Sequence, residues 1–393
     1  MMCKRLWALP LSLFLLLACA CSGLGASHEA AASIGELRAL LSAADAGDVI
    51  LIKGEIACGD SAPLTCAVPV RITSDGHDPA TLRGLRLQDA SISFSDIHLA
   101  DALSIAGASH VQLLRGAVVT GSEGRAALSF SGSGTLIAER GSSIAGGPGS
   151  DGVSIRHSGG EFYASLEGSV SGGGGYTGGH GVVVSPLGVG GAMMITGGVR
   201  GGEGEVMGGN ALNLYDLNSN AYVTVDGQLH GGAGSIGGDG IQLVSATGSV
   251  NVGISGRVSG GSGSIYGGDA IMLMNAEGAS SIHLYGEFSG GNATSPEAQP
   301  GTALVMVGPV TSMRTRVSDC MLEDGRRMLA TDVPPSRVTP LPEIQSSTEE
   351  IDVLEPIDST ALPMPEPTPM PTIEPQADTT PEPEREATPG EAA

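Results

Sequence analysis

The sequence predicts an all-β protein, a right-handed parallel β-helix with three short strands in each coil of 25–30 residues. Three observations predict this fold: glycine-rich segments recur at a nearly fixed period, apolar residues alternate after each segment, and one apolar residue keeps its place in every period. The chain has 393 residues, of which 62 are glycine. A unit of this size cannot bury a core alone, so the units must stack.

Glycine-rich segments set the period. The five clearest begin at Gly172, Gly201, Gly231, Gly260 and Gly290. Their successive starts are 29, 30, 29 and 30 residues apart. Two shorter units, spaced 25 and 26 residues from the next, precede them and begin at Gly121 and Gly146. We expect these glycines to occupy tight corners, where the backbone needs φ > 0.

Alternating apolar residues predict two strands with one buried face in each unit. The first-strand pairs are Val182 and Val184, Leu212 and Leu214, Ile241 and Leu243, and Ile271 and Leu273. The second-strand pairs are Val223 and Val225, Val250 and Val252, and Ile282 and Leu284. A very short third strand supplies one apolar residue per unit, in the column Val119, Ile144, Val170, Val199, Leu229, Val258 and Phe288. Parallel stacking turns such columns into ladders with a spacing of about 4.8 Å.

A helix is predicted to cover the N-terminal end of the solenoid, because an open end exposes core and strand edges. Ser33 and Glu36 have the spacing of a capping box. The apolar residues that follow at helical spacing are Ile34, Leu37, Leu40 and Leu41. Short strands are expected to follow, in the segments VILIKGEI, VPVRITSDG, ATLRGLRL, ISFSDIHL and VQLLRGAVV.

Composition divides the chain into four regions. Lys4 and Arg5 before the apolar run Leu6–Ala18 predict a signal peptide over 1–18, and a short linker follows over 19–32. The β-helix is expected over 33–331, with glycine-rich coils over 121–308. From residue 333 onward there are 14 prolines and 13 acidic residues, which predicts a disordered acidic tail over 332–393.

Cysteines carry two further predictions. The residues LLAC ending at Cys19 resemble the lipobox of bacterial lipoproteins, in which the cysteine is lipidated and anchors the mature chain. Ordinary cleavage around Ala18 is the alternative and gives a secreted protein. Export permits disulfides, and Cys58 and Cys66 bracket a short loop across which they could pair. No CxxC motif occurs, so no structural zinc site is predicted.

The order of segments from ELRALLSAADAGDVILIKG through PVRITSDG to LRGLRL resembles the N-terminal half of pectin-lyase-like right-handed β-helix proteins. The resemblance covers about residues 33–320 and concerns layout. That family includes polysaccharide lyases and hydrolases, bacterial adhesins and phage tailspikes, so the fold leaves the function open. Gly179-His180-Gly181 resembles one polygalacturonase motif, but the accompanying Asn-Thr-Asp, Asp-Asp and Arg-Ile-Lys motifs are absent from the sequence. No catalytic residue is predicted.

A polar column stands before the first strand of successive coils and is the candidate cation or ligand site: Asp151, His180, Asn210, Asp239 and Asp269. Such residues suit corners, because they tolerate the left-handed conformation or form Asx turns. The segment 146–154, GGPGSDGVS, matches a calcium-binding nonapeptide, but the next nine residues do not repeat it. Calcium is therefore an open alternative and no other cofactor is predicted. Tyr176 and Tyr266, in the glycine loops, are candidate glycan contacts.

The net charge of the chain restricts the classes of partner that it can bind. The net charge is −23, which argues against nucleic acid as a partner. We expect an exported cell-surface protein that acts in binding or display, adhesin-like or structural in the envelope. Its expected partners are a surface glycan or an envelope protein, with membrane contact only through an N-terminal lipid. The oligomeric state is not predicted. The alternative is a polysaccharide lyase or glycoside hydrolase with a degenerate site, which requires a groove holding acids and at least one Arg, His or Lys.

Overall fold

The computed structural model describes residues 28–59, 61–76, 79–157, 159–218, 220–246, 250–276 and 281–307, and three strands at 314–317, 320–321 and 327–328. The chain separates into two units, residues 1–334 and 335–393, and every described residue lies in the first. The predicted signal peptide, Cys19 and the tail over 332–393 lie outside the described residues.

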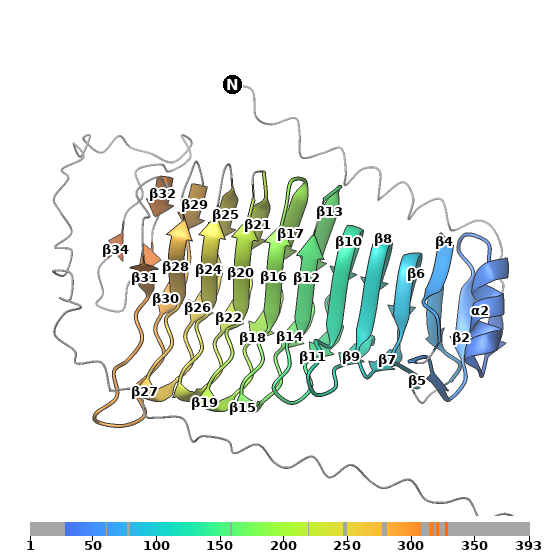
Figure 1. The fold of residues 1–393 in the computed structure, drawn as a ribbon, viewed down its shortest axis with the longest axis horizontal. Coiled ribbons are helices and arrows are strands. Elements are labelled where there is room, and N and C mark those ends of the chain that lie inside the picture. Colours follow the sequence, from blue (N-terminus) through green and yellow to red (C-terminus); the bar gives the residue numbers. More distant parts are fainter. Residues whose placement is uncertain are drawn as a thin grey trace, which may run out of the picture. The chain divides into compact units, whose positions relative to one another are not determined.

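Each coil runs through three strands and returns beside the strand from which it started (Figure 1). One coil consists of β16 (Val182–Leu187), β17 (Gly191–Ile195) and β18 (Gly198–Arg200). β16 pairs in parallel with β12 (Val153–His157) of the preceding coil and with β20 (Leu212–Leu217) of the next. The predicted right-handed parallel β-helix, with three strands in each coil, is therefore confirmed.

First and second strands belong to one 18-stranded sheet. In the N-terminal coils both are parts of one long strand, and from β12 onward a turn divides them. The undivided strands are β4 (Leu64–Ser74), β6 (Arg86–Ser95), β8 (Leu103–Leu113) and β10 (Leu128–Ala138), preceded by β1 (His28–Ala31) and β2 (Val49–Ile52). The later first strands are β12, β16, β20, β24 (Ile241–Ala246), β28 (Ile271–Ala276) and β31 (Leu304–Val307). The later second strands are β13 (Phe162–Leu166), β17, β21 (Tyr222–Val225), β25 (Asn251–Ile254), β29 (Ser281–Leu284) and β32 (Arg314–Val317).

Third strands form a 12-stranded sheet in which only the last pair is antiparallel. They are β3 (Glu55–Ala57), β5 (Ala80–Arg83), β7 (Ile97–Ala100), β9 (Val118–Thr120), β11 (Ser143–Ala145), β14 (Ser169–Ser171), β18, β22 (Gln228–His230), β26 (Arg257–Ser259), β30 (Glu287–Ser289), β33 (Cys320–Met321) and β34 (Arg327–Met328). The predicted apolar column from Val119 to Phe288 is confirmed, because its seven members pair in register and are at most 3% exposed. It continues toward the N-terminus through Leu99, Leu82 and Ile56.

One second-strand prediction is wrong in register. Val252 and Ile254 pair with Val223 and Val225, whereas Val250 lies just before β25. The error left the buried face unchanged, because side chains alternate with a period of two and the shift was two residues. The other predicted first-strand and second-strand pairs stand in register.

Helix α2 (Ile34–Ala43) covers the N-terminal end of the solenoid and packs on β1 and β4 (Figure 1). The Ser33 Oγ accepts the Glu36 N–H at 3.2 Å, as in the predicted capping box, while the Glu36 carboxylate accepts the N–H of Ala32 at 2.8 Å. Its buried side chains are Leu37 and Leu41. Among the described residues, no helix is long and apolar enough to cross a membrane.

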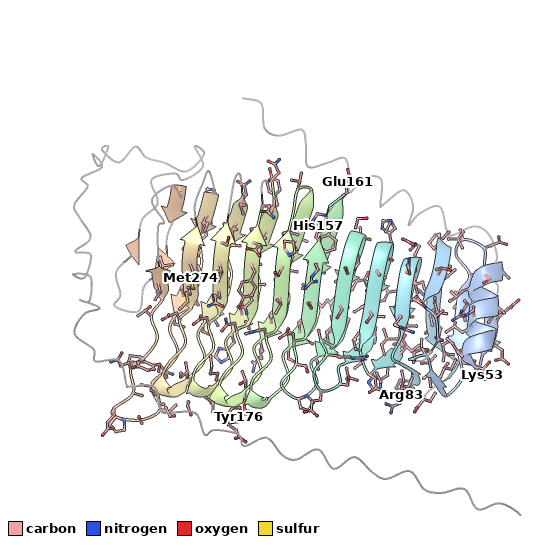
Figure 2. All side chains as sticks on the ribbon, viewed as in Figure 1. Lys53, Arg83, His157, Glu161, Tyr176 and Met274 are labelled. Carbon is pink, nitrogen blue, oxygen red and sulfur yellow. The ribbon has the colours of Figure 1, made fainter. Side chains whose placement is uncertain are left out.

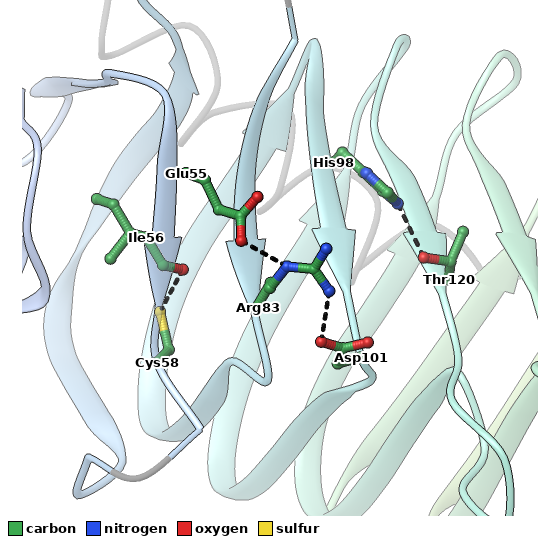
Figure 3. A network of polar contacts seen from close by, with 7 residues as sticks. All are labelled: Glu55, Ile56, Cys58, Arg83, His98, Asp101 and Thr120. Carbon is green, nitrogen blue, oxygen red and sulfur yellow. Dashed lines mark hydrogen bonds and ion pairs between the residues drawn. The ribbon is translucent and has the colours of Figure 1, made fainter.

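Polar pairs link the outer faces of the N-terminal third strands (Figure 3). Arg83 binds Glu55 of the preceding coil at 2.6 Å and Asp101 of the following coil at 2.8 Å. His98 and Thr120 pair in the same way at 2.8 Å. Because the charged side chains are 45–58% exposed, each ion pair contributes little, and stacking of the apolar ladders holds the coils together.

Cys58 and Cys66, which could pair across their short loop, are both buried free thiols in the structure. The Cys58 sulfur lies 3.7 Å from the carbonyl of Ile56, and the Cys66 sulfur lies 3.2 Å from that of Val68. Each thiol thus faces a carbonyl two residues away along its own segment. Burial raises the pKa of Cys58 to about 11, which disfavours the thiolate that disulfide formation needs.

Candidate functional site

Every long coil carries a glycine-rich loop between its third strand and the next first strand. The tip of four of these loops is a short extra strand that was not predicted. The tip strands form a separate parallel sheet along the lower edge of the solenoid in Figure 1. They are β15 (Gly175–Thr177), β19 (Gly204–Met207), β23 (Gly234–Ile236) and β27 (Gly263–Tyr266).

Two glycine pairs form the neck of each loop. In one coil these are residues 201–202, leaving the third strand, and residues 208–209, entering the next first strand. Gly209 N–H donates to the carbonyl of Gly202 at 2.8 Å, and Gly202 N–H donates to Gly179 of the preceding coil at 2.7 Å. The same alternation continues as one zigzag of hydrogen bonds through Ser150, Gly173, Gly179, Gly202, Gly209, Gly232, Gly238, Gly261, Gly268, Gly291 and Gly301.

Glycine is required in the necks because a Cβ would overlap the backbone of the neighbouring coil, and not because the backbone is left-handed. A Cβ at Gly202 would lie 2.1 Å from the carbonyl oxygen of Gly173, and a Cβ at Gly209 would lie 2.0 Å from that of Gly179. None of the neck glycines has φ > 0, and among the described residues the last glycine with positive φ is Gly190. The prediction of corner glycines with φ > 0 is therefore wrong for the neck glycines of the long coils. Their glycines let adjacent backbones touch.

The loop tips expose apolar side chains that we name the tip strip: Tyr176, Met207, Ile236, Ile265 and Tyr266. These side chains are between 37% and 71% exposed. Met207, Ile236 and Tyr266 pair in register on three adjacent strands, so they form a row with a spacing of about 4.8 Å. Tyr176 lies at the lower edge of the solenoid in Figure 2. Of the two tyrosines proposed from sequence, Tyr266 is in this row, whereas Tyr176 is exposed on the neighbouring tip strand β15, next to Thr177, which pairs with Met207.

The five predicted column residues form a ladder in which each side chain accepts the backbone N–H of the next member. The successive pairs are His180 N–H to Asp151 Oδ1 (2.8 Å), Asn210 N–H to His180 Nδ1 (2.9 Å), Asp239 N–H to Asn210 Oδ1 (2.7 Å), Asp269 N–H to Asp239 Oδ1 (2.8 Å) and Thr302 N–H to Asp269 Oδ1 (2.8 Å). Asp, Asn and His share an acceptor at the same reach from the backbone. That shared acceptor explains why three residue types alternate in one column.

This arrangement corrects the interpretation of the column as corner residues. None of the five members has positive φ, and each acceptor reaches the neighbouring coil instead of its own turn. His180 is a ladder member with Nδ1 as acceptor, and burial lowers its pKa, which favours the neutral ring. Within the described residues, no group of three or more His, Cys, Asp or Glu could hold a metal ion. Calcium binding along the column stays an untested prediction.

A buried polar network that was not predicted lies beside the ladder. The Asn210 amide donates to Asn213 Oδ1 at 2.7 Å and to Gln242 Oε1 at 3.1 Å, and the Tyr215 hydroxyl donates to the same Gln242 oxygen at 3.3 Å. Burial raises the pKa of Tyr215, so its hydroxyl stays protonated as the donor. The signal was an amide residue between two core apolar residues at the same place in two successive first strands, Asn213 and Gln242.

A groove of about 770 Å³, which we name the axial groove, follows the corner between second and third strands. Its floor is Gly197, Gly227, Gly256 and Gly286; one wall is Thr196, Asp226, Ser255 and Tyr285; the other is Gly198, Gln228, Arg257 and Glu287. Arg140 and Glu167 line its N-terminal end. This groove was not predicted, although a glycine recurs two positions before each member of the apolar column from Val199 to Phe288.

A second concavity, of about 380 Å³, lies where the ladder begins. It is lined by the in-register Ser104, Ser129 and Ser154 of three neighbouring strands, with Arg125 and Asp151 at its edge. It is half the size of the axial groove and spans fewer coils.

No protein-family model matches the chain, and no curated protein or solved structure matches it. Fold and loops together define the class, a parallel β-solenoid with a lateral sheet of glycine-necked loops.

Proposed function

We propose that this chain is an exported surface β-solenoid that acts in binding or display, with the tip strip as its contact surface. The observation that carries the proposal is the row of exposed apolar and aromatic side chains on adjacent loop tips. Single exposed apolar residues are ordinary, but a contiguous exposed patch marks an interaction surface. The glycine necks support the proposal, since they hold the tips in register and leave the row preformed before it meets a partner.

The chemistry of the tip strip fits a glycan or an envelope protein. Tyr176 and Tyr266 present ring faces on which sugars stack, while Met207, Ile236 and Ile265 suit an apolar protein surface. Both sugar rings and apolar protein surfaces can pack on these uncharged side chains without forming an ion pair. The proposed partners are therefore a surface glycan or an envelope protein.

The expected location follows from the N-terminus. We propose export, with a lipid on Cys19 that holds the mature protein at the outer surface of a membrane. A layout shared with pectin-lyase-like proteins is part of the same proposal. Mass spectrometry of the mature protein is expected to find residue 19 as the new N-terminus, heavier by a diacylglyceryl group. An unmodified N-terminal residue refutes the anchor and leaves a secreted protein.

A polysaccharide lyase or glycoside hydrolase is the second candidate, and the axial groove favours it. The groove holds Glu167, Asp226 and Glu287 together with Arg140 and Arg257, the set of residue types that such an enzyme requires. Arg257 and Glu287, however, pair with each other at 2.8 Å, and both are 65% exposed. A pair bonded to itself in water is a weak catalytic arrangement, so binding remains the preferred function.

Loop-tip substitutions test the binding proposal. We expect the full chain to bind at least one polymer in a panel of cellulose, chitin, peptidoglycan and polygalacturonate. Replacing Tyr176, Met207 and Tyr266 together by serine should lower the bound fraction at least tenfold, because stacking and apolar contact are lost together. The matched control is Tyr222→Ser, which removes a tyrosine 45% exposed on β21, away from the loops.

The same panel separates the two candidate functions. Equal losses in the triple variant and in Tyr222→Ser contradict the tip strip as the contact surface. Release of new reducing or unsaturated ends from any polymer favours the enzyme.

A further inference from the structure

The axial groove has a floor without side chains over four successive coils. A Cβ on Gly197, Gly227, Gly256 or Gly286 would lie 1.9–2.1 Å from a glycine carbonyl oxygen of the preceding coil. Only glycine fits there, so the corner stays bare while the residues on either side carry side chains. Coils are about 4.8 Å apart, and four of them make a trough of about 15–20 Å.

The walls offer donors and acceptors in nearly equal measure. Thr196 and Ser255 provide hydroxyls, Gln228 an amide and Asp226 a carboxylate that accepts the Ser255 hydroxyl at 3.0 Å. These four side chains are exposed toward the groove and not buried in the core. Such a lining matches a ligand that carries many groups able both to donate and to accept hydrogen bonds.

Charge in the groove is nearly balanced, since Arg140 and Arg257 face Glu167, Asp226 and Glu287. A polyanion therefore gains little electrostatic attraction in the groove, and the net charge of −23 on the chain repels it. An extended peptide needs apolar pockets for its side chains, and Tyr285 is the only apolar or aromatic side chain among the groove residues.

Tyr285 gives the groove one aromatic platform at its C-terminal end. It is 42% exposed, and its ring lies nearly parallel to that of His283, with centroids 6.0 Å apart. Tyr285 also lines the groove, where a ligand can contact its ring. Sugar rings stack on such faces, whereas the rest of the groove binds their hydroxyls.

We propose that the axial groove binds a neutral oligosaccharide, extended along the solenoid axis. The bare floor admits the width of the chain, the walls hydrogen-bond its hydroxyls, and Tyr285 stacks on a ring near one end. This site is separate from the tip strip, and its existence does not depend on the function proposed for the loops.

Gly198 gives a direct way to block the groove without disturbing the core. A Cβ on Gly198 meets no atom within 4 Å, and this residue lines the groove. Gly198→Ile should therefore fold and fill the trough at one coil. Gly253→Ile is the matched control, because Gly253 also has no atom within 4 Å of a Cβ but lies outside the groove, on β25.

Calorimetric titration of the full chain with xylohexaose, cellohexaose and chitohexaose tests the proposal. We expect at least one neutral hexamer to bind, its trimer to bind at least tenfold more weakly, and hexagalacturonate to bind more weakly than the neutral hexamer. Gly198→Ile should lower the affinity at least tenfold and Tyr285→Ala about fivefold, while Gly253→Ile should leave it unchanged. The melting temperature of each variant is measured alongside.

Three outcomes overturn the proposal. They are the absence of binding by all three neutral hexamers, tighter binding of hexagalacturonate, and equal effects of the Gly198 and Gly253 substitutions. If Gly198→Ile does not fold, Tyr285→Ala and Gln228→Ala decide, and unchanged affinity in both rejects the site. The triple tip-strip variant should keep its hexamer binding, so failure of the groove and failure of the tip strip are distinguishable.

Discussion

Gly232→Ala is expected to destabilise the solenoid by about 3 kcal/mol, a large effect for one methyl group. The added Cβ would lie 1.9 Å from the carbonyl oxygen of Gly202 and 3.0 Å from the amide nitrogen of Gly209. Both neighbours are backbone atoms inside the hydrogen-bonded zigzag, so neither can move without breaking contacts in two coils. Thermal unfolding followed by circular dichroism measures the loss.

Gly253→Ala is the matched control for this prediction. A Cβ on Gly253 has no neighbour within 4 Å and its φ is not in the left-handed region, so we expect a change within about 0.5 kcal/mol. Because solenoid coils can unfold separately, limited proteolysis should also show earlier cleavage near the altered neck. Similar melting temperatures for the two variants contradict the close-packed neck.

Asp239→Asn is expected to stabilise the protein by about 2–3 kcal/mol at pH 8 and by almost nothing at pH 4. Asp239 is 8% exposed, and burial raises its pKa from 3.8 to about 6; a hydrogen bond from Asp269 N–H lowers the pKa and the nearby Asp269 charge raises it. The folded state binds a proton more readily than the unfolded state, so ionisation of Asp239 costs stability. That cost is complete above pH 6 and gone below about pH 3.8.

The asparagine in this variant keeps the acceptor oxygen that receives the N–H of Asp269 at 2.8 Å, and only the buried charge is lost. Denaturant unfolding from pH 4 to pH 8 measures the difference between the variant and the parent. Asp239→Leu is the companion variant, because it also removes the charge but leaves the Asp269 N–H without its acceptor, so it should be less stable than Asp239→Asn by about 1–3 kcal/mol at every pH. A stability difference between Asp239→Asn and the parent that does not change with pH rejects the assigned cause.

Gly232 belongs to the neck zigzag and Asp239 to the ladder, and both support the loops that form the proposed contact surface. The neck zigzag and the ladder flank the same loops, one at their base and one where each loop enters the next first strand. Both run from coil to coil through backbone groups. The tip strip therefore rests on two rows of inter-coil hydrogen bonds, which keep its strands about 4.8 Å apart.

Periodicity in the sequence was enough to predict the solenoid. The column from Val119 to Phe288 has one apolar residue per unit, and only stacked coils can bury such a column. The helix over Ile34–Ala43 was equally readable, because its cap and its apolar spacing are local features. Both predictions depend on residue type and spacing along one chain.

Only the tertiary structure decided what the repeated residues do. Glycine in the necks and Asp239 in the ladder have a local explanation, a corner, and a non-local one, contact with the neighbouring coil. The sequence is compatible with both explanations. Contact with the neighbouring coil is the correct one, because strands of successive coils stack about 4.8 Å apart. At that distance a Cβ on Gly232 overlaps a carbonyl, and the Asp239 carboxylate reaches the next amide. The sequence thus determined which residues repeat, and the spacing between coils determined why.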